Sequence, residues 1–512
     1  MSKLYVILIL AFILRVTLAL RDDANLTARL HNDDSFYLHT VSKNIGFGNG
    51  FTIDGTHVTN GVQPLVVVLN APFYYISSGD RWLGLRLSFI LASFVDCISI
   101  VLLYKLLQTL TKDRRNGWTS PPIIGAVLWA FLYPIISQTM NGMETGLLSL
   151  FMMLALYLYS TYRQKDTTEP LSAKEYAALG ITLGFLVLAR IDTVIFCAVL
   201  FFNELYILRR RASLSILLLP LFSLLVSLPW WIYNVTVFGS LMPSSGTAES
   251  INGPSIAENI LRAATTLSDI VVSMMYLPYD KVSFPMKILW ICIGIGISLI
   301  LFISKDIREV ITSVISFTAI RILLIHGLIL LLFYVVVFHA PYFIPRYLQP
   351  LRIFGLITMS VVLSTVIRER LIKTKLLLRT ILVAVSLVII SFNVIFYANN
   401  FFGKGMSELY YAGLWAGEHP NELVGMQQSG TAGFVADNIV NLDGKVNAEV
   451  LGYMKKGQRG AYIANSNITH IADWHEFADV LMSESEQYGV KYTLVDSFNL
   501  LRFYQRIPSK LK

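Results

Sequence analysis

The chain has 512 residues, of which 55% are apolar and only 14% are charged. Soluble domains carry roughly a quarter charged residues, so this composition, with a mean hydropathy of +0.60, excludes an ordinary soluble enzyme. The net charge of +8 arises from short basic clusters between apolar runs, a distribution typical of membrane topology and not of a nucleic-acid-binding face. We therefore predict an α-helical polytopic membrane protein without a nucleic-acid partner.

Apolar runs long enough to cross a bilayer recur over residues 1–400. Residues 1–20 form the first run, and since similar runs follow, we interpret it as an uncleaved span rather than a signal peptide. The pattern predicts about eleven transmembrane helices, each needing about 20 predominantly apolar residues. The further spans are expected at 83–107, 121–139, 144–162, 174–190, 192–208, 212–233, 286–303, 317–338, 350–367 and 377–398.

Lysine and arginine gather in every second connection between these runs. The basic connections lie near residues 112–115, 163–174, 209–211, 305–308 and 368–375, and the short connections near 138–141, 190–192 and 339–350 are poor in charge. Basic connections stay in the cytoplasm, so we predict a cytoplasmic N-terminus and an extracytoplasmic C-terminus. The exterior face then receives residues 21–81, 234–285 and 401–512.

Residues 401–512 are polar, charged and punctuated by glycine, unlike the rest of the chain. Residues 460–464 and 490–495 are typical of buried strands. Between them, Asp473 and Glu476 have the spacing of a capping box, which predicts a helix running to about residue 488. This strand–helix–strand order predicts a small extracytoplasmic α/β domain.

The first exterior segment holds two adjacent carboxylates, Asp33 and Asp34, soon after the first span. At this boundary one could act as a general base while its neighbour orients substrate or holds a divalent cation. A helix cap or an Asx turn in a solvated loop would also explain the pair. The residues alone leave both interpretations open.

Charged side chains also interrupt apolar sequence near the exterior boundary. Arg190 and Asp192 stand between two runs, and Arg346 follows a proline before another. At a helix centre each would cost about 2.5–3.5 kcal/mol, so an interfacial position is expected. There an arginine is suited to bidentate contact with a lipid phosphate, although a tight exterior turn explains these residues equally well. Glu144 opens a span, where a carboxylate simply complements a helix N-terminus.

In chain order these stretches resemble the GT-C superfamily of polytopic glycosyltransferases, which take a sugar from a polyprenyl-phosphate carrier on the outer face of the membrane. The likeness is to bacterial members related to the terminal arabinofuranosyltransferases and, more distantly, to protein O-mannosyltransferases. Ile191 departs from the pattern, because many relatives have proline there. The motifs that carry the resemblance lie at 33–37 (DDSFY), 59–65 (TNGVQPL), 141–145 (NGMET), 188–192 (LARID), 239–244 (GSLMPS), 345–350 (PRYLQP) and, in the tail, 440–444 (VNLDG).

The resemblance implies an inverting hexosyl or pentosyl transfer to a glycan, lipid or protein acceptor in the bacterial cytoplasmic (inner) membrane. Asp33 would deprotonate the acceptor hydroxyl, and Asp34 would assist it or bind a divalent cation, the one cofactor left open. Arg190 and Arg346 would hold the departing phosphate. Residues 1–400 would form the catalytic transmembrane domain and residues 401–512 the extracytoplasmic domain. Further substrate contacts are expected from Tyr37, Asn60, Glu144 and Asp192.

Two other classes of protein share parts of this pattern. A multi-pass transporter or lipid flippase is equally rich in apolar runs. Transporters, however, place charged residues near the midplane of the membrane and show inverted repeats. In this sequence the middle parts of the apolar runs are largely uncharged, and no repeat is visible. A sensor or scaffold that presents residues 401–512 would leave the acidic first exterior segment unexplained. Glycosyl transfer is therefore the function that the sequence predicts.

Overall fold

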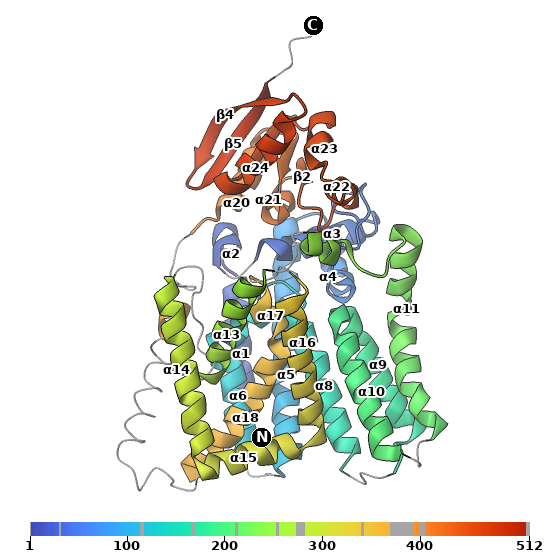
Figure 1. Ribbon diagram of the computed structural model, residues 1–512, viewed down its shortest axis with the longest axis vertical. Helices are drawn as coiled ribbons and strands as arrows, with labels where there is room; N and C mark the ends of the chain where they lie inside the picture. Colours follow the sequence, from blue (N-terminus) through green and yellow to red (C-terminus); the bar gives the residue numbers. More distant parts are fainter. Residues whose placement is uncertain are drawn as a thin grey trace.

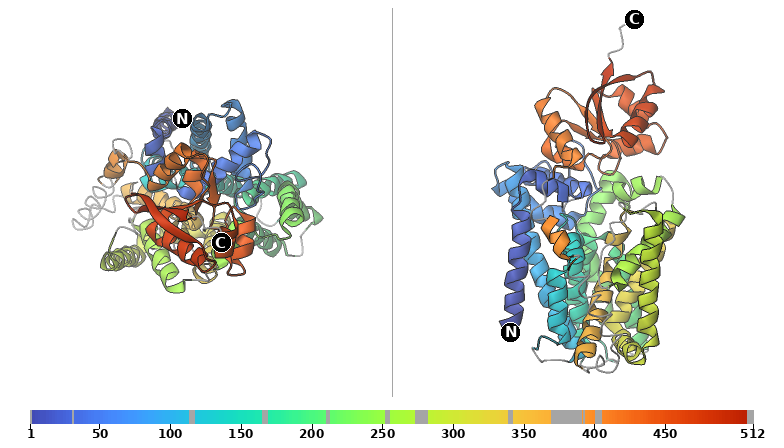
Figure 2. Two further views of the ribbon diagram at one scale, coloured as in Figure 1. Left: turned by 90° about the horizontal axis from the view of Figure 1, so that it is seen from above. Right: turned by 90° about the vertical axis from the view of Figure 1, so that its left-hand side faces the viewer.

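The computed structural model shows a bundle of long helices with a small α/β domain on one end (Figure 1). The N-terminus lies at the far end of the bundle, and the view from above in Figure 2 places the domain over the helices. This is the predicted fold class, an α-helical polytopic protein with a C-terminal α/β domain. The structure describes residues 2–29, 32–112, 117–164, 169–209, 213–251, 255–272, 282–338, 342–368, 391, 393–399 and 405–507.

Within the described residues, eight helices are long and apolar enough to cross a membrane, or nine if one bent pair counts as a single span. The predicted span at 174–190 corresponds to α9 (Ala173–Ala189), a shorter helix of 17 residues, and the one at 377–398 lies largely outside the described residues. The predicted positions therefore agree with the helices, while the total of about eleven stays a prediction. The eight are α1 (Ser2–Ala19), α5 (Arg81–Thr111), α8 (Thr145–Tyr162), η1 (Ile191–Thr193) with α10 (Val194–Leu208), η3 (Leu214–Leu217) with α11 (Leu218–Phe238), α14 (Phe284–Ile303), α16 (Thr318–Val336) and α18 (Gln349–Arg368).

The run predicted as one span at 121–139 is divided into α6 (Pro121–Phe131) and α7 (Tyr133–Thr139), which meet at 64°. Leu132 between them is extended, and Pro134 has no N–H with which to continue the hydrogen-bond ladder of α6. The bend therefore follows from the proline, and α7 leads directly into the 141–145 motif.

Most of the first two exterior segments is helical. The first contains α2 (Asp23–Arg29), α3 (Asp33–Gly46) and α4 (Pro64–Ile76), and α3 lies at the end of the bundle beneath the α/β domain (Figure 1). Amphipathic α15 (Lys305–Ser316) lies at the opposite end of the bundle. Between α11 and α18 the chain also forms α12 (Ser244–Ile251), α13 (Ile256–Val271) and α17 (Ile344–Tyr347).

The α/β domain has a five-stranded sheet in the order β2-β1-β3-β5-β4. Strand β1 pairs in parallel with β2 and β3, and β5 pairs antiparallel with β3 and β4. Buried side chains such as Val424, Ile471 and Phe503 give the sheet an apolar core of its own. The strands are β1 (Val424–Met426), β2 (Ile439–Asn441), β3 (His470–Trp474), β4 (Lys491–Phe498) and β5 (Leu501–Ile507), and the helices are α20 (Glu408–Glu418), α21 (Gly430–Val435), α22 (Ala448–Met454), α23 (Arg459–Asn465) and α24 (His475–Glu486).

One of the two strands predicted for this domain is wrong. Residues 460–464 belong to α23, and a short apolar run does not by itself separate a strand from a helix. Residues 490–495 do overlap β4. That strand lies at the sheet edge, where most of its residues are exposed rather than buried.

The predicted capping box is also wrong, although a helix does begin where it was expected. Trp474 is the N-cap of α24 and makes no side-chain capping hydrogen bond. The Asp473 carboxylate instead accepts from the backbone N–H groups of Gln427 at 2.7 Å and Gln428 at 2.9 Å, beyond the end of β1. Asp473 therefore fixes the turn that leads to α21 rather than the start of α24.

Ion pairs are buried among the bundle helices. Arg15 of α1 pairs with Asp96 of α5, which also accepts from the Trp129 indole N–H at 2.8 Å. Arg163 at the end of α8 pairs with Glu204 of α10. Charges inside a membrane bundle are costly unless they are paired, and these pairs meet that condition. They therefore join helices of the bundle.

Candidate functional site

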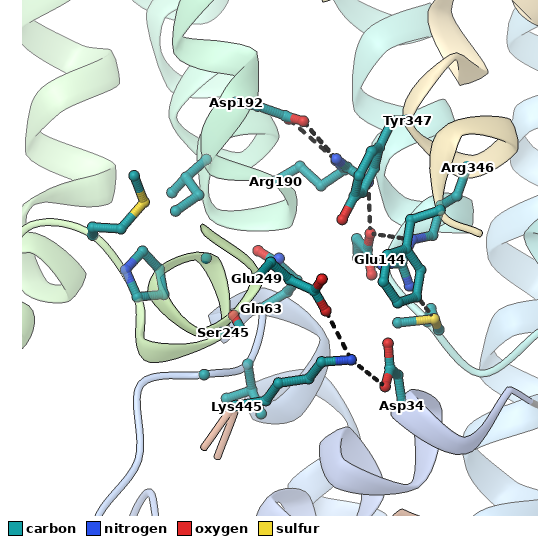
Figure 3. Close-up of a pocket in the computed structure, with 18 of the residues that line it drawn as sticks. Asp34, Gln63, Glu144, Arg190, Asp192, Ser245, Glu249, Arg346, Tyr347 and Lys445 are labelled. Carbon is teal, nitrogen blue, oxygen red and sulfur yellow. Dashed lines mark hydrogen bonds and ion pairs between the residues drawn. The ribbon is translucent and has the colours of Figure 1, made fainter. Parts of the chain in front are cut away.

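A cavity of about 550 Å³ is lined by residues of the first 400 positions and by Lys445 of the α/β domain (Figure 3). Its wall is largely apolar and carries a few charged groups, which is typical of a ligand site. Residues from seven stretches of the chain, most of them far apart in the sequence, meet there. The charged residues that line it are Asp34, Glu144, Arg190, Asp192, Glu249, Arg346 and Lys445, and the aromatic ones are Tyr37, Trp231, Phe333, Tyr334, Phe338, Phe343 and Tyr347.

Arg190 is held in place by two carboxylates. Helix α9 ends at the preceding residue, and the extended backbone of Arg190 (φ −153°, ψ 120°) brings its side chain back over η1. Its guanidinium donates to Glu144 Oε1 at 3.0 Å and to Asp192 Oδ1 at 3.1 Å. The Tyr334 hydroxyl donates to Asp192 Oδ2 at 2.6 Å, so this carboxylate is fixed as well. The expected tight turn is present, and it places the charged pair in the cavity wall.

Arg346 is less firmly committed to protein partners. It comes from α17, and its Nε lies 3.8 Å from Glu144 Oε1, an ion pair without a hydrogen bond. Its guanidinium carbon lies 5.1 Å and 5.4 Å from the ring centres of Phe343 and Tyr347. The second carboxylate oxygen of Glu144 is buried and has no hydrogen-bond partner among the described residues. One guanidinium N–H group of Arg346 contacts the Met143 sulfur, and its other N–H donors are left for an anion that enters the cavity.

Asp33 does not line the cavity. Its two carboxylate oxygens accept from the backbone N–H groups of Gly430 at 2.9 Å and Thr431 at 2.7 Å, so Asp33 caps α21 of the α/β domain. Burial raises the pKa of this carboxyl above its usual range, and the hydrogen bonds from Thr431 and Gly430 oppose that rise. Asp33 thus fastens the first exterior segment to the α/β domain.

Asp34 does line the cavity, and its carboxylate faces Lys445 (Figure 3). The Lys445 ammonium lies 3.5 Å from Asp34 Oδ1 and 2.9 Å from Glu249 Oε1. Lys445 follows β2, and Glu249 belongs to α12. Sequence reasoning missed both residues. The only local signal was the 440–444 motif, which ends immediately before Lys445.

The four residues expected to contact substrate divide into two groups. Tyr37, Glu144 and Asp192 line the cavity, and the Tyr37 hydroxyl donates to Asp443 Oδ2 at 3.2 Å. Asn60 is buried outside the cavity lining, where its Oδ1 accepts from the backbone N–H of Ser244 at 2.9 Å. Asn60 therefore links the first exterior segment to the second.

The carboxylates around the cavity do not fit a divalent cation. Among the described residues, no group of three or more histidine, cysteine or acidic side chains is placed to hold a metal ion. Asp34 and Glu249 face the same point, but the ammonium of Lys445 already lies between them. A hard divalent cation needs several oxygen ligands around it, which this arrangement does not offer. The structure therefore does not support a divalent cation bound to Asp34.

The comparisons with known proteins find likeness in structure alone. No protein-family model and no curated protein matches the sequence. The apo oligosaccharyltransferase AglB of Archaeoglobus fulgidus has 12% identity and a TM-score of 0.52, over 99% of this chain and 74% of that one. AglB with an inhibitory peptide and a dolichol-phosphate gives the same values.

The second similar protein is ArnT of Cupriavidus metallidurans. Its complex with undecaprenyl phosphate has 12% identity and a TM-score of 0.52, over 98% of this chain and 97% of that one. The apo state has 10% identity and a TM-score of 0.54, with the same coverage. Likeness at such low identity establishes the fold, and both proteins are GT-C glycosyltransferases. The chain is therefore an integral membrane protein with the GT-C fold that its sequence motifs predict.

Proposed function

We propose that the protein is an inverting glycosyltransferase that moves a sugar from a polyprenyl-phosphate carrier to an acceptor hydroxyl. The observation that carries the proposal is that the Asp34 carboxylate and the guanidinium groups of Arg190 and Arg346 line the same cavity. The structural neighbours support the lipid-linked donor, because AglB was solved with dolichol-phosphate and ArnT with undecaprenyl phosphate. The acceptor belongs to the glycan, lipid or protein classes.

The two arginines stabilise the departing polyprenyl phosphate. Negative charge develops on the phosphate oxygen as the bond to the anomeric carbon breaks, and a fixed cation in a site shielded from water stabilises that charge most strongly. Arg346 makes the direct contact, because it lines the cavity and its carboxylate neighbour, Glu144, lies 3.8 Å away without a hydrogen bond. Arg190 lies behind it, oriented by Asp192 and by Glu144, which ion-pairs with both arginines.

Asp34 rather than Asp33 serves as the general base. The acceptor oxygen attacks the anomeric carbon on the face opposite the phosphate, its proton passes to Asp34, and the carbon–oxygen bond to the phosphate breaks. A single displacement of this kind inverts the anomeric configuration. Asp34 faces the cavity, whereas both oxygens of Asp33 already accept backbone hydrogen bonds from α21. Asp33 accordingly positions its neighbour and the α/β domain.

The two-domain division follows from the same arrangement. Residues 1–400 supply the donor site and the base, and residues 401–512 supply Lys445 to the cavity wall. We assign the cavity to the extracytoplasmic side of a bacterial cytoplasmic membrane, with the N-terminus in the cytoplasm. The basic connections at 112–115 and 305–308 support this orientation.

A transporter is the less favoured alternative. Transporters bind their substrates near the midplane at the interface of repeats. Here the buried charges Arg15 and Asp96 are paired with each other, as are Arg163 and Glu204. The cavity is instead lined by residues of α3 and α17, which lie toward the domain end of the bundle (Figure 1), and by Lys445 of the α/β domain.

Purified protein in lipid nanodiscs tests the proposal. It is incubated with a panel of radiolabelled polyprenyl-phosphate hexoses and pentoses, and both sugar transfer and donor hydrolysis are measured. At least one donor should be consumed by the wild type and not by Arg346→Ala. The control is Arg321→Ala, because Arg321 is exposed on α16 away from the cavity lining. Consumption of no donor by the wild type, or equal consumption by Arg346→Ala, would contradict the proposal.

A further inference from the structure

The cavity contains a cation that belongs to the chain itself. The Lys445 ammonium lies between the Asp34 and Glu249 carboxylates, at 3.5 Å and 2.9 Å (Figure 3). The three residues come from three different regions, namely α3, α12 and the turn after β2. Their side chains are 17–20% exposed, so the ion pairs are shielded from bulk water. The ammonium also lies 4.9 Å from the ring centre of Phe343.

The main chain of Lys445 is fixed as firmly as its side chain. Its carbonyl oxygen accepts from the Ser244 hydroxyl at 2.6 Å, and its N–H donates to Asp443 Oδ1 at 2.8 Å. The first exterior segment packs so closely here that a Cβ on Gly61 would lie 1.8 Å from the same carbonyl oxygen. A long lysine side chain normally adopts many conformations at a surface. These backbone contacts instead give Lys445 a defined position in the cavity.

The charge arrangement keeps this lysine protonated. Burial lowers the pKa of Lys445, but the carboxylates of Asp34 and Glu249 raise it by more, so the pKa lies well above its usual range. Without the ammonium the two carboxylates would face each other in a shielded site, an arrangement that proteins relieve with a proton or a cation. The position that Lys445 occupies is thus one where a positive charge is required.

We infer that Lys445 is the resident cation of this cavity, and that its ammonium takes the place between Asp34 and Glu249 that a divalent ion would otherwise take. The consequence for catalysis rests on the proposed function. Lys445 holds the Asp34 carboxylate toward the acceptor, and sugar transfer proceeds without an added divalent cation. Lys445 is a positioning residue in this account. It acts through Asp34 and makes the α/β domain part of the active site.

Manganese binding tests the inference without any activity assay. Full-length protein is washed with chelator and titrated with Mn²⁺ while electron paramagnetic resonance measures the free ion. The wild type should bind no Mn²⁺ at the cavity. Lys445→Asp places a third carboxylate there and should bind Mn²⁺ roughly 10-fold or more tightly than the control. Lys456→Asp is the matched control, because it makes the same charge change at an exposed lysine of the same domain.

Further variants make every result of the titration decisive. Lys445→Gln removes the charge and keeps a polar side chain only one atom shorter, so it should also gain Mn²⁺ binding if Lys445→Asp does not fold. Adding Glu249→Gln to Lys445→Asp should remove the new site. Wild-type Mn²⁺ binding that disappears in Asp34→Asn would overturn the inference. So would Lys445 variants that bind Mn²⁺ no better than Lys456→Asp.

Transfer assays provide the second readout. The wild-type rate should be unchanged by chelator, Lys445→Arg should retain most of it, and Lys445→Gln should lose about 10-fold or more and regain part of the rate with Mn²⁺. A chelator-sensitive wild type, or a fully active Lys445→Gln, would overturn the inference. If no donor supports transfer at all, the proposed function fails, and the Mn²⁺ titration still decides the role of Lys445.

Discussion

Asp33 and Asp34 are adjacent in α3, but their side chains serve different neighbours, because consecutive residues of an α-helix point about 100° apart. Asp33 meets the first N–H groups of α21, and Asp34 meets the cavity. An Asp-Asp pair in a sequence does not reveal which member faces which way. That depends on where α21 docks, about 400 residues later in the chain.

Asparagine substitutions separate the two roles. Asp34→Asn should lower the turnover number by about 10²–10⁴-fold, since asparagine keeps the shape and loses the basicity, while thermal stability is unchanged. Asp33→Asn offers one acceptor oxygen where two are used, so it should lower stability by about 1.5–3 kcal/mol with a smaller effect on turnover. Calorimetry and initial rates on both variants give the comparison. The reverse result, with Asp33→Asn inactive and Asp34→Asn active, would return the general base to Asp33.

Arg346 gives a cleaner test of phosphate binding than Arg190. Arg346→Ala should weaken donor binding by about 1.5–3 kcal/mol, the scale of a charge-assisted hydrogen bond, and Arg346→Lys should recover only part of it, because lysine lacks the planar fork. Binding of a fluorescent polyprenyl phosphate measures the effect. Unchanged affinity in Arg346→Ala would contradict the role. Arg190→Ala also leaves Glu144 and Asp192 without the cation that they share. Its loss of function would therefore combine an effect on folding with an effect on donor binding.

Among the helices and strands, sequence patterns predicted the features that depend on local composition. The apolar runs located the membrane helices, because burial in lipid depends on composition over about 20 residues. The strand at 460–464 was wrong because α23 packs on α24 through Gly460, whose Cβ would lie 2.0 Å from the Glu484 carbonyl oxygen. Lys445 and Glu249 were missed because their meeting depends on the docking of two exterior elements. Neither residue stands in a motif that suggests chemistry.

The turn between β2 and α22 should be sensitive to the size of residue 61. Gly61→Ala forces a methyl group toward the Lys445 carbonyl oxygen and the Ser244 hydroxyl, so it should destabilise the docked domain by about 1–3 kcal/mol, as overpacking does. Gly417→Ala in α20 is the control, because a Cβ there meets nothing within 4 Å. Thermal unfolding in detergent measures both variants. Equal stabilities would mean that the close contact at Gly61 is not maintained in solution.

At the scale of the whole molecule, the N-terminus and the α/β domain lie at opposite ends of the bundle (Figure 1). In the predicted orientation, with the basic connections in the cytoplasm, the domain and the cavity would face the exterior. An alkaline phosphatase fused to residue 512 should therefore be active, and the same reporter inserted at residue 304, before α15, should be inactive. Activity of a cytoplasm-only reporter at residue 512 would contradict the predicted orientation.

The contribution of Lys445 to the cavity also sets an order of events during biosynthesis. A ribosome completes α3 and α12 long before it reaches residue 445, so the nascent membrane bundle carries Asp34 and Glu249 without the ammonium that separates them. In the predicted topology, the cavity would acquire its full charge set only after the last fifth of the chain has crossed the membrane and Asp33 has engaged α21. A partly made chain would thus sit among lipid-linked sugars without consuming them. In the proposed function, assembly of the α/β domain on the bundle would then be the step that activates sugar transfer.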